Sequence, residues 1–226
     1  MVVNALLLFN RTGTQWRNMD SRYQAKRPII QYYYYRWQER GVWQEILDSL
    51  VKEVRQVQGE SPCPSRVAVD SQSVKTVPFV SQNCGVDGNK KINGRKRHIV
   101  VDKYGLPIAI HVGAANLHDG NQGLELLWQL ERFPHIELLC LDSAYQGEFE
   151  EAAELYGFKT EISQKPQSSL GFVPQKGRWQ VERSFSWLNA YRRLAKEYEK
   201  TAKSTVSFIQ LAFINMILAK ISNLKT

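Results

Sequence analysis

The spacing of hydrophobic residues along the chain changes from helical to strand-like near residue 60. Ahead of that point the pattern predicts three helices, over residues 1–11, 28–40 and 42–58. The third shows amphipathic spacing most clearly, through Ile46, Leu47, Leu50, Val51 and Val54. Gly59 to Ser65 holds two prolines and no hydrophobic pattern, which is typical of a linker. The pattern therefore predicts a helical domain over residues 1–60 and a second domain over residues 61–226.

The second domain shows short apolar and β-branched runs that alternate with helical segments. The runs predict strands at residues 66–75, 98–101, 106–112, 136–141 and 158–163. Helical spacing predicts helices at residues 124–130, 147–157, 178–198 and 205–222. We expect an antiparallel meander of the first three strands, and a fourth strand that arrives through a helical crossover and lies parallel to one of them. This order predicts an α/β fold with a mixed sheet between two layers of helices.

The N-terminal segment leaves two questions open. Its first helix has no capping residue and nothing upstream to pack against, which predicts an N-terminally truncated domain. The helix at residues 28–40 carries Tyr32 to Tyr35, Arg36 and Trp37. These residues are typical either of a helix-turn-helix that reads DNA or simply of a helical core.

Composition and charge narrow the class of protein. A net charge of +8 over 226 residues favours a polyanionic partner. Cys63, Cys84 and Cys140 are odd in number and form no CxxC pair, which favours a reducing, cytoplasmic compartment. The longest apolar run, residues 208–221, is interrupted by polar residues and is too short to span a bilayer, so we expect no membrane contact.

Three acidic residues occupy positions that suggest a catalytic or metal-binding role. Asp70 interrupts the alternation of one strand, and Asp142 directly follows the apolar strand at residues 136–141. Glu182 lies early in the helix at residues 178–198 and is surrounded by arginines. An acid in a core strand is costly unless it is paired or bound to a metal. If the two strands are neighbours, both aspartates reach one edge of the sheet, where the helix can bring Glu182.

Three carboxylates in one place repel one another unless a cation compensates their charge. Oxygen ligands select Mg²⁺ or Mn²⁺ over zinc. Two such ions can activate a water or a 3′-hydroxyl and stabilise the leaving oxygen of a phosphodiester. The basic residues nearby would then hold a nucleic-acid backbone over the ions.

Four blocks of the sequence carry a resemblance to a known family: VDSQSVKT (69–76), GNKKINGRKRHIVVDKYGLP (88–107), LDSAYQGE (141–148) and RWQVERSFSWLNAYRRLAKEYE (178–199). In this order they resemble bacterial insertion-sequence DDE transposases, and most closely the insertion-sequence-five family. The segments at residues 16–19 and 32–46 resemble the N-terminal domain of that family. The resemblance covers essentially the whole chain.

The resemblance implies a ribonuclease-H-like catalytic domain that nicks double-stranded DNA at transposon ends and joins the freed 3′-OH to target DNA. It implies Asp70, Asp142 and Glu182 as catalytic residues and ligands of two Mg²⁺ or Mn²⁺ ions, and a homodimer on DNA. Asn189 stands where relatives often carry a lysine, so Arg192 or Arg193 is expected to supply that phosphate contact. The full set of expected DNA-contacting residues is Lys75, Lys90, Lys91, Arg95, Lys96, Arg97, Arg178, Arg183, Arg192 and Arg193.

Several alternatives remain. Asp119, in NLHDGN, is a rival third acid, although its setting is typical of a turn and a helix N-cap. Glu197 and Glu199 are further rivals, and we expect them to pair with Lys196, Lys200 or Lys203. The hairpin over Arg95 to Arg97 could also be a solvated edge. A DNA-binding remnant that does not transpose and a ribonuclease-H-like nuclease without strand transfer are the alternative functions.

Overall fold

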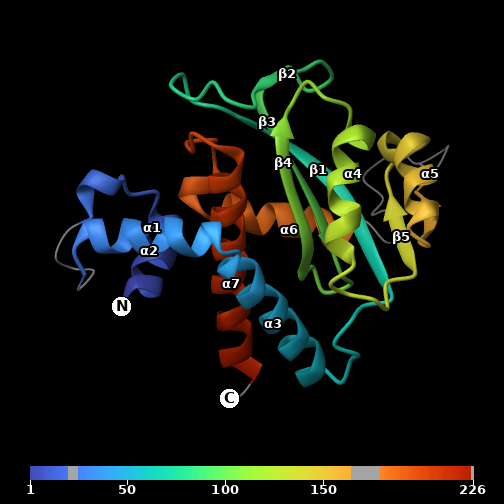
Figure 1. Ribbon diagram of the computed structural model, residues 1–226, viewed down its shortest axis with the longest axis horizontal. Coiled ribbons are helices and arrows are strands. Elements are labelled where there is room, and N and C mark those ends of the chain that lie inside the picture. Colours follow the sequence, from blue (N-terminus) through green and yellow to red (C-terminus); the bar gives the residue numbers. More distant parts are fainter. Residues whose placement is uncertain (20–24, 164–178, 225–226) are drawn as a thin grey trace, which may run out of the picture.

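The computed structural model describes residues 1–19, 25–163 and 179–224 (Figure 1). Its helices are α1 (Val2–Thr12), α2 (Arg27–Glu39), α3 (Val42–Val57), α4 (Asp119–Leu130), α5 (Glu148–Leu155), α6 (Trp179–Asn189) and α7 (Ala202–Leu224). Its strands are β1 (Arg66–Lys75), β2 (Gly85–Asp87), β3 (Ile92–Val101), β4 (Pro107–Ala114), β5 (Leu138–Leu141) and β6 (Lys159–Ile162). Short 3₁₀ turns are η1 (Trp16–Asn18), η3 (Ser143–Tyr145) and η4 (Arg192–Leu194).

One mixed sheet contains all the strands of the described chain. Its order is β2-β3-β1-β5-β6, and β4 pairs with β3. The meander is confirmed, because β3 is antiparallel to both β1 and β4. The crossover is also confirmed, because β5 lies parallel to β1, with Ala68 opposite Cys140. Strand β5 therefore ends beside the middle of β1.

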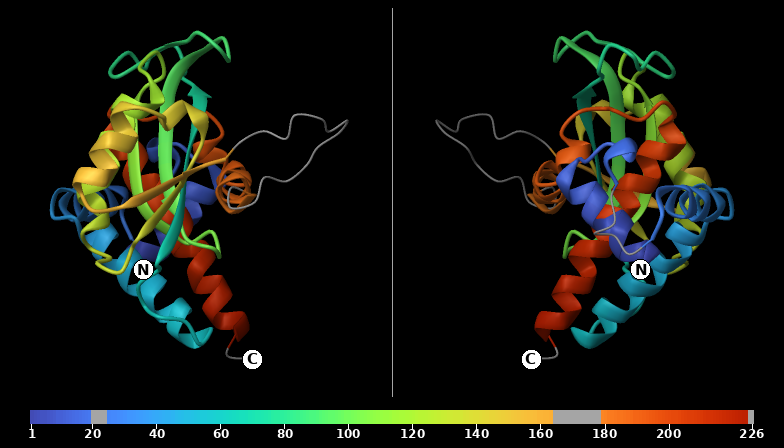
Figure 2. Two further views of the ribbon diagram at one scale, coloured as in Figure 1. Left: turned by 90° about the vertical axis from the view of Figure 1, so that its right-hand side faces the viewer. Right: turned by 90° about the vertical axis from the view of Figure 1, so that its left-hand side faces the viewer.

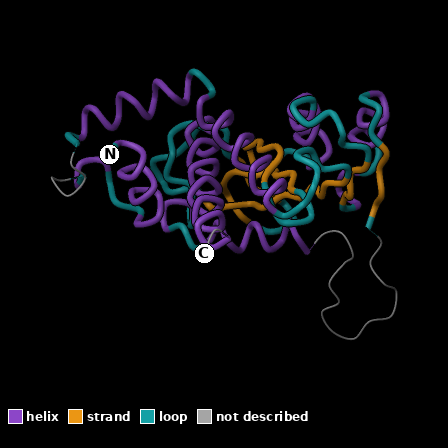
Figure 3. Tube along the Cα trace, turned by 90° about the horizontal axis from the view of Figure 1, so that it is seen from below, coloured by secondary structure: helices purple, strands orange, loops and turns teal. Residues whose placement is uncertain are grey.

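Helices cover both faces of the sheet, as predicted. Figure 2 shows α4 and α5 on one side of the strands and α6 and α7 on the other, and Figure 3 shows from below that helices lie on both sides of the strands. In β1 the alternation of side chains sends Asp70 and Gln72 to the α6 face and Ser71 and Ser73 to the α4 face. The two faces therefore carry different polar side chains of the same strand.

Helix α7 organises the N-terminal helices. It packs against α1, α3 and β4, and its buried Phe208 ring stacks on Tyr34 of α2 at 4.9 Å between centroids. Tyr34 is thus a core residue, whereas Tyr32, Tyr33 and Tyr35 are exposed. The helix-turn-helix interpretation and the domain boundary at residue 60 stay predictions.

Helix α7 is long and apolar enough to cross a membrane by length and composition, over Ala202–Asn223. However, 67% of that segment is buried inside the molecule, as in the core helix of a soluble protein, so it is weak evidence for a span.

Two predicted boundaries are wrong. The helix expected over residues 178–198 ends at Asn189 and is followed by η4 and an extended segment in which Glu197 pairs with Thr76. Strand β3 begins at Ile92 rather than His98, so the basic stretch over residues 95–97 lies inside the sheet. Both differences bring charged residues into the interior.

Candidate active site

The register of β1 and β5 sets Asp70 and Asp142 at the same level of the sheet. The parallel register sets Arg66, Val67 and Ala68 opposite Leu138, Leu139 and Cys140. Continued by two residues, the same register places Asp70 opposite Asp142, and neighbouring strands lie about 4.8 Å apart. Both side chains are half-buried, so they remain accessible to a ligand.

The helix that carries Glu182 packs on the same face of the sheet. Gln180 of α6 borders a cavity of about 30 Å³ together with Ala68 and Cys140. Because side chains alternate along a strand, Ala68 and Cys140 share this face with Asp70 and Asp142. Glu182 is exposed in the first turn of α6. Among the described residues, no three His, Cys, Asp or Glu side chains form a group that could hold a metal ion together.

A buried tyrosine lies behind the aspartate pair. Tyr145 ends η3, whose N-cap is Asp142, and its hydroxyl lies 2.9 Å from His98 Nδ1. Burial raises the pKa of Tyr145 well above its usual value, and the carboxylates of Asp70, Asp119 and Asp142 raise it further. The hydroxyl therefore stays protonated while three carboxylates surround it.

Asp119, the rival third acid, lies on the opposite face from α6. It is in the first turn of α4, where it accepts a hydrogen bond from Ser71 Oγ at 2.9 Å and pairs with Lys96 Nζ at 3.0 Å. The N-cap of α4 is His118, whose side chain accepts from Gly120 N. Asp119 is therefore occupied by a lysine and a serine and does not join the Asp70–Asp142 pair in a metal-holding group.

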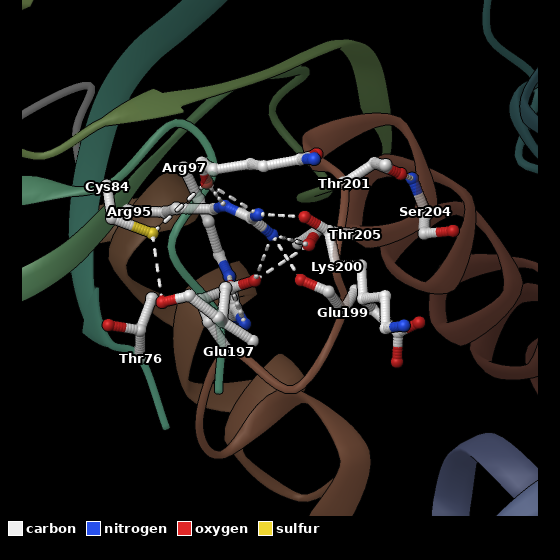
Figure 4. Close-up of polar contacts among 12 residues, drawn as sticks. Thr76, Cys84, Arg95, Arg97, Glu197, Glu199, Lys200, Thr201, Ser204 and Thr205 are labelled. Atoms are coloured by element: carbon white, nitrogen blue, oxygen red, sulfur yellow. Dashed lines mark hydrogen bonds and ion pairs between the residues drawn. The ribbon is translucent and has the colours of Figure 1, made fainter. Parts of the chain in front are cut away.

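The structure corrects the role of the most basic stretch. Arg95 and Arg97 are fully buried on the α7 side of the sheet, where they surround Glu197 (Figure 4). Arg97 Nε donates to Glu197 Oε1 at 2.6 Å, and Arg95 donates to the backbone oxygens of Glu199 and Lys200 at 2.8 Å. Neither guanidinium is accessible to a phosphate, so the prediction that they contact DNA is wrong here, and so is the solvated hairpin edge.

Lys96 and Arg193 are also buried, against expectation. Lys96 is held by Asp119 and by the Leu117 carbonyl. Arg193 lies over the Phe9 ring, with 4.1 Å from Cζ to the centroid, and pairs with Glu199 at 2.6 Å. The glutamates 197 and 199 therefore pair with buried arginines, and the expected lysine partners are wrong.

The remaining basic candidates divide by exposure. Arg183 is half-buried between Trp179 and Trp187, with its Cζ 4.4 and 4.7 Å from their ring centroids. Arg178 lies outside the described residues. The exposed members of the set are Lys75, Lys90, Lys91 and Arg192.

The donor set fits a divalent cation. Two carboxylates from neighbouring strands offer hard oxygen ligands, and Mg²⁺ is commonly held by one or two carboxylates, with water and substrate oxygens completing its shell. Asp70 Oδ1 accepts from Ser71 N at 2.7 Å, and Asp142 Oδ1 accepts from Ser143 Oγ at 2.9 Å. Both carboxylates are therefore held in place by a hydrogen bond from the residue that follows each of them.

Sequence reasoning assigned no role to Tyr145, His98 or Ser71. Tyr145 lies within the block LDSAYQGE, and His98 interrupts an otherwise apolar end of β3. A polar residue in a core strand is the same signal that singled out Asp70, and it could have identified His98.

Comparison with known proteins decides the family. A family model described as the transposase DDE domain matches residues 61–217. The chain belongs to the DDE transposase family. Its mixed sheet with helices on both faces is the predicted ribonuclease-H-like fold of this domain.

Two relatives carry the same assignment. Over 130 residues the chain is 31% identical to a Burkholderia cepacia protein assigned as a transposase for insertion sequence element IS402, and the match covers 52% of the chain and 60% of that relative. Over 123 residues it is 32% identical to a protein of Brucella ovis (strain ATCC 25840 / 63/290 / NCTC 10512) assigned as a transposase for insertion sequence element IS6501. That match covers 52% of the chain and 92% of the relative. The chain thus matches less than two thirds of the first relative.

Proposed function

We propose that the chain is an insertion-sequence transposase of the insertion-sequence-five family, which cleaves DNA at transposon ends and joins the freed 3′-OH to target DNA. The observation that carries the proposal is the Asp70–Asp142 pair at the end of β5, inside a transposase DDE domain. Two adjacent carboxylates are costly to hold together without a cation, so their placement supports metal-dependent chemistry.

Asp70, Asp142 and Glu182 are the proposed ligands of two Mg²⁺ or Mn²⁺ ions. When bound, such ions activate a water or 3′-hydroxyl and stabilise the leaving oxygen. The two aspartates contribute from rigid strands, and Glu182 from a helix packed on the same face of the sheet. The protein thereby orients the ligands before DNA arrives.

The DNA partner is proposed to approach from the side of the sheet toward which β1 and β5 both run. Lys75 ends β1, and Lys90 and Lys91 lie in the turn between β2 and β3 at the same end. All three are exposed, as is Arg192. Phosphate contacts from these residues would position double-stranded DNA over the carboxylates. We further propose a helical DNA-binding domain over residues 1–60, a homodimer on DNA and a cytoplasmic location.

The test is an end-cleavage and joining assay with labelled DNA that contains both flanks of the chain's own coding sequence, Mg²⁺ or Mn²⁺, and a target plasmid. Cleaved ends that become joined to the plasmid support the transposase. Cleavage without joining favours the ribonuclease-H-like nuclease, and binding without cleavage favours the remnant. The variant Glu161→Gln, which changes an exposed surface ion pair, serves as a control for protein handling.

A further inference from the structure

A network of hydrogen-bonded side chains lies on the α4 face of the sheet, directly behind the carboxylate pair. The Tyr145 hydroxyl lies 2.9 Å from His98 Nδ1, and the Ser71 side chain also interacts with this hydroxyl. Ser71 Oγ donates in turn to Asp119, which pairs with Lys96. Because Tyr145 and His98 are fully buried, water does not compete for these bonds.

Each of the two aspartates is connected to this hydrogen-bond network by a short stretch of backbone. Tyr145 N donates to the Asp142 carbonyl at 2.9 Å, which closes the 3₁₀ turn that the Asp142 side chain caps. Ser71 directly follows Asp70 and donates its backbone N–H to the Asp70 carboxylate at 2.7 Å. A contact that holds Tyr145 and Ser71 together therefore also fixes the middle of β1 and the turn after β5, which carry the two carboxylates.

Packing keeps the Tyr145 ring in one place. Its centroid is 5.2 Å from that of Phe149, in an edge-to-face arrangement. Helix α4 approaches closely because Gly123 has no side chain, and a Cβ there would lie 2.8 Å from Tyr145 Cε1. The ring has no space to rotate away, so its hydroxyl can act as a fixed anchor between β1, β3 and η3.

We infer that Tyr145 is a positioning residue for the metal site: through Ser71 and His98 it holds Asp70 and Asp142 in the arrangement that binds a divalent cation. The inference rests on the proposed function, because it requires that the two aspartates ligate metal. Groups that hydrogen-bond and orient metal ligands typically contribute 10- to 100-fold to metal affinity.

The experiment measures Mn²⁺ affinity of the purified chain without DNA, by the electron paramagnetic resonance signal of free Mn²⁺, in wild type, Tyr145→Phe, Tyr191→Phe and Asp70→Asn. Tyr191→Phe is the matched control, because Tyr191 is also buried and its hydroxyl accepts a bond from Asn215 Nδ2, on α7. We expect Tyr145→Phe to weaken Mn²⁺ binding by about 10-fold and Tyr191→Phe to change it by less than about 2-fold. Urea unfolding of both variants checks that the fold is retained.

Each outcome has a defined meaning. Wild-type affinity in Tyr145→Phe, or equal weakening in both tyrosine variants, overturns the inference and leaves the carboxylate site intact. If Asp70→Asn binds Mn²⁺ as tightly as the wild type does, the proposed metal site itself is overturned. If Tyr145→Phe does not fold, Ser71→Ala removes the next hydroxyl of the hydrogen-bond network. The same loss of Mn²⁺ affinity is expected for this variant, and an unchanged affinity would contradict the inference.

Discussion

Arg97 donates to Glu197 across the interior of the protein, and both side chains are almost completely buried. Arg95 lies 3.5 Å from the other oxygen of the same carboxylate. One glutamate thus compensates two guanidinium groups, and it fixes the segment after α6 against β3. The segment that follows the Glu182 helix is therefore anchored to the strand next to Asp70.

Removing this carboxylate should be strongly destabilising. We expect Glu197→Gln to lower the free energy of unfolding by about 3–5 kcal/mol, because two buried arginines lose their counter-charge. Glu161→Gln is the matched control, since it breaks the Arg66–Glu161 pair, which is half exposed, and it should cost no more than about 1 kcal/mol. Urea unfolding measures both, and equal losses would show that the buried cluster has no special role.

Stability should fall in mild acid because of His98. Burial lowers the pKa of His98 well below its usual value, and the positive charges of His111, Lys96 and Lys90 act in the same direction. Between the folded pKa and the unfolded value of about 6.5, the unfolded chain binds a proton that the folded chain does not. The contribution of neutral, buried His98 to the free energy of unfolding is complete above pH 6.5. It is lost as the pH decreases, by at most about 1.4 kcal/mol per pH unit.

The check is urea unfolding from pH 7.5 to 5 in wild type, His98→Gln and His135→Gln. His135 is exposed, so its variant should keep the wild-type pH dependence. His98→Gln should be less stable at pH 7 but lose less stability on acidification. An unchanged slope in His98→Gln would contradict the assignment to this ring.

Gly123 should be intolerant of a side chain although it lies inside a helix. Helix propensity alone would favour alanine by about 1 kcal/mol. However, the added Cβ would meet the rings of Tyr145 and Phe149 at 2.8 Å, and overpacking of this kind typically costs 1–3 kcal/mol. We expect Gly123→Ala to be destabilised in thermal unfolding. Gly120→Ala in the same helix should not be destabilised, because the nearest atom to its Cβ is 3.4 Å away, and equal behaviour of the two variants would refute the packing argument.

The exposed lysines should account for part of the salt dependence of DNA binding. We expect Lys90→Gln/Lys91→Gln to weaken binding to any duplex and to reduce the slope of log affinity against log salt by about 0.9 for each lysine. Lys103→Gln removes one lysine charge at the opposite end of the sheet, in the turn between β3 and β4, and should leave the slope unchanged. Fluorescence anisotropy over a salt series measures the slopes, and identical slopes in all three proteins would exclude this surface.

The sequence predicted the positions of Asp70 and Asp142 because their signals are local. Each interrupts or ends an apolar strand, and the rule that a helical crossover joins parallel strands then places the strands together. The depth of Arg95 and Arg97 could not be predicted, because their partner Glu197 lies 100 residues away from Arg97 in the chain. A run of basic residues normally indicates a solvated surface, and only the tertiary contact reverses that expectation.

The Tyr145 network was missed for the same reason. Its members come from β1, β3, η3 and α4, and the hydrogen bonds Tyr145–His98 and Ser71–Asp119 join residues that lie far apart in the sequence. Glu182 is the opposite case. Its place at the start of a helix was predicted, while its approach to the aspartates depends on how α6 crosses the sheet.

The central claim is that Asp70, Asp142 and Glu182 act together on a phosphodiester. The direct measurement is the rate of Mg²⁺-dependent end cleavage by wild type, Asp70→Asn, Asp142→Asn and Glu182→Gln, each shown to be folded by urea unfolding. The account predicts that every one of the three substitutions lowers the rate by at least about 1,000-fold, equivalent to roughly 4 kcal/mol of transition-state stabilisation. Cleavage at the wild-type rate by Asp70→Asn, Asp142→Asn or Glu182→Gln would contradict it.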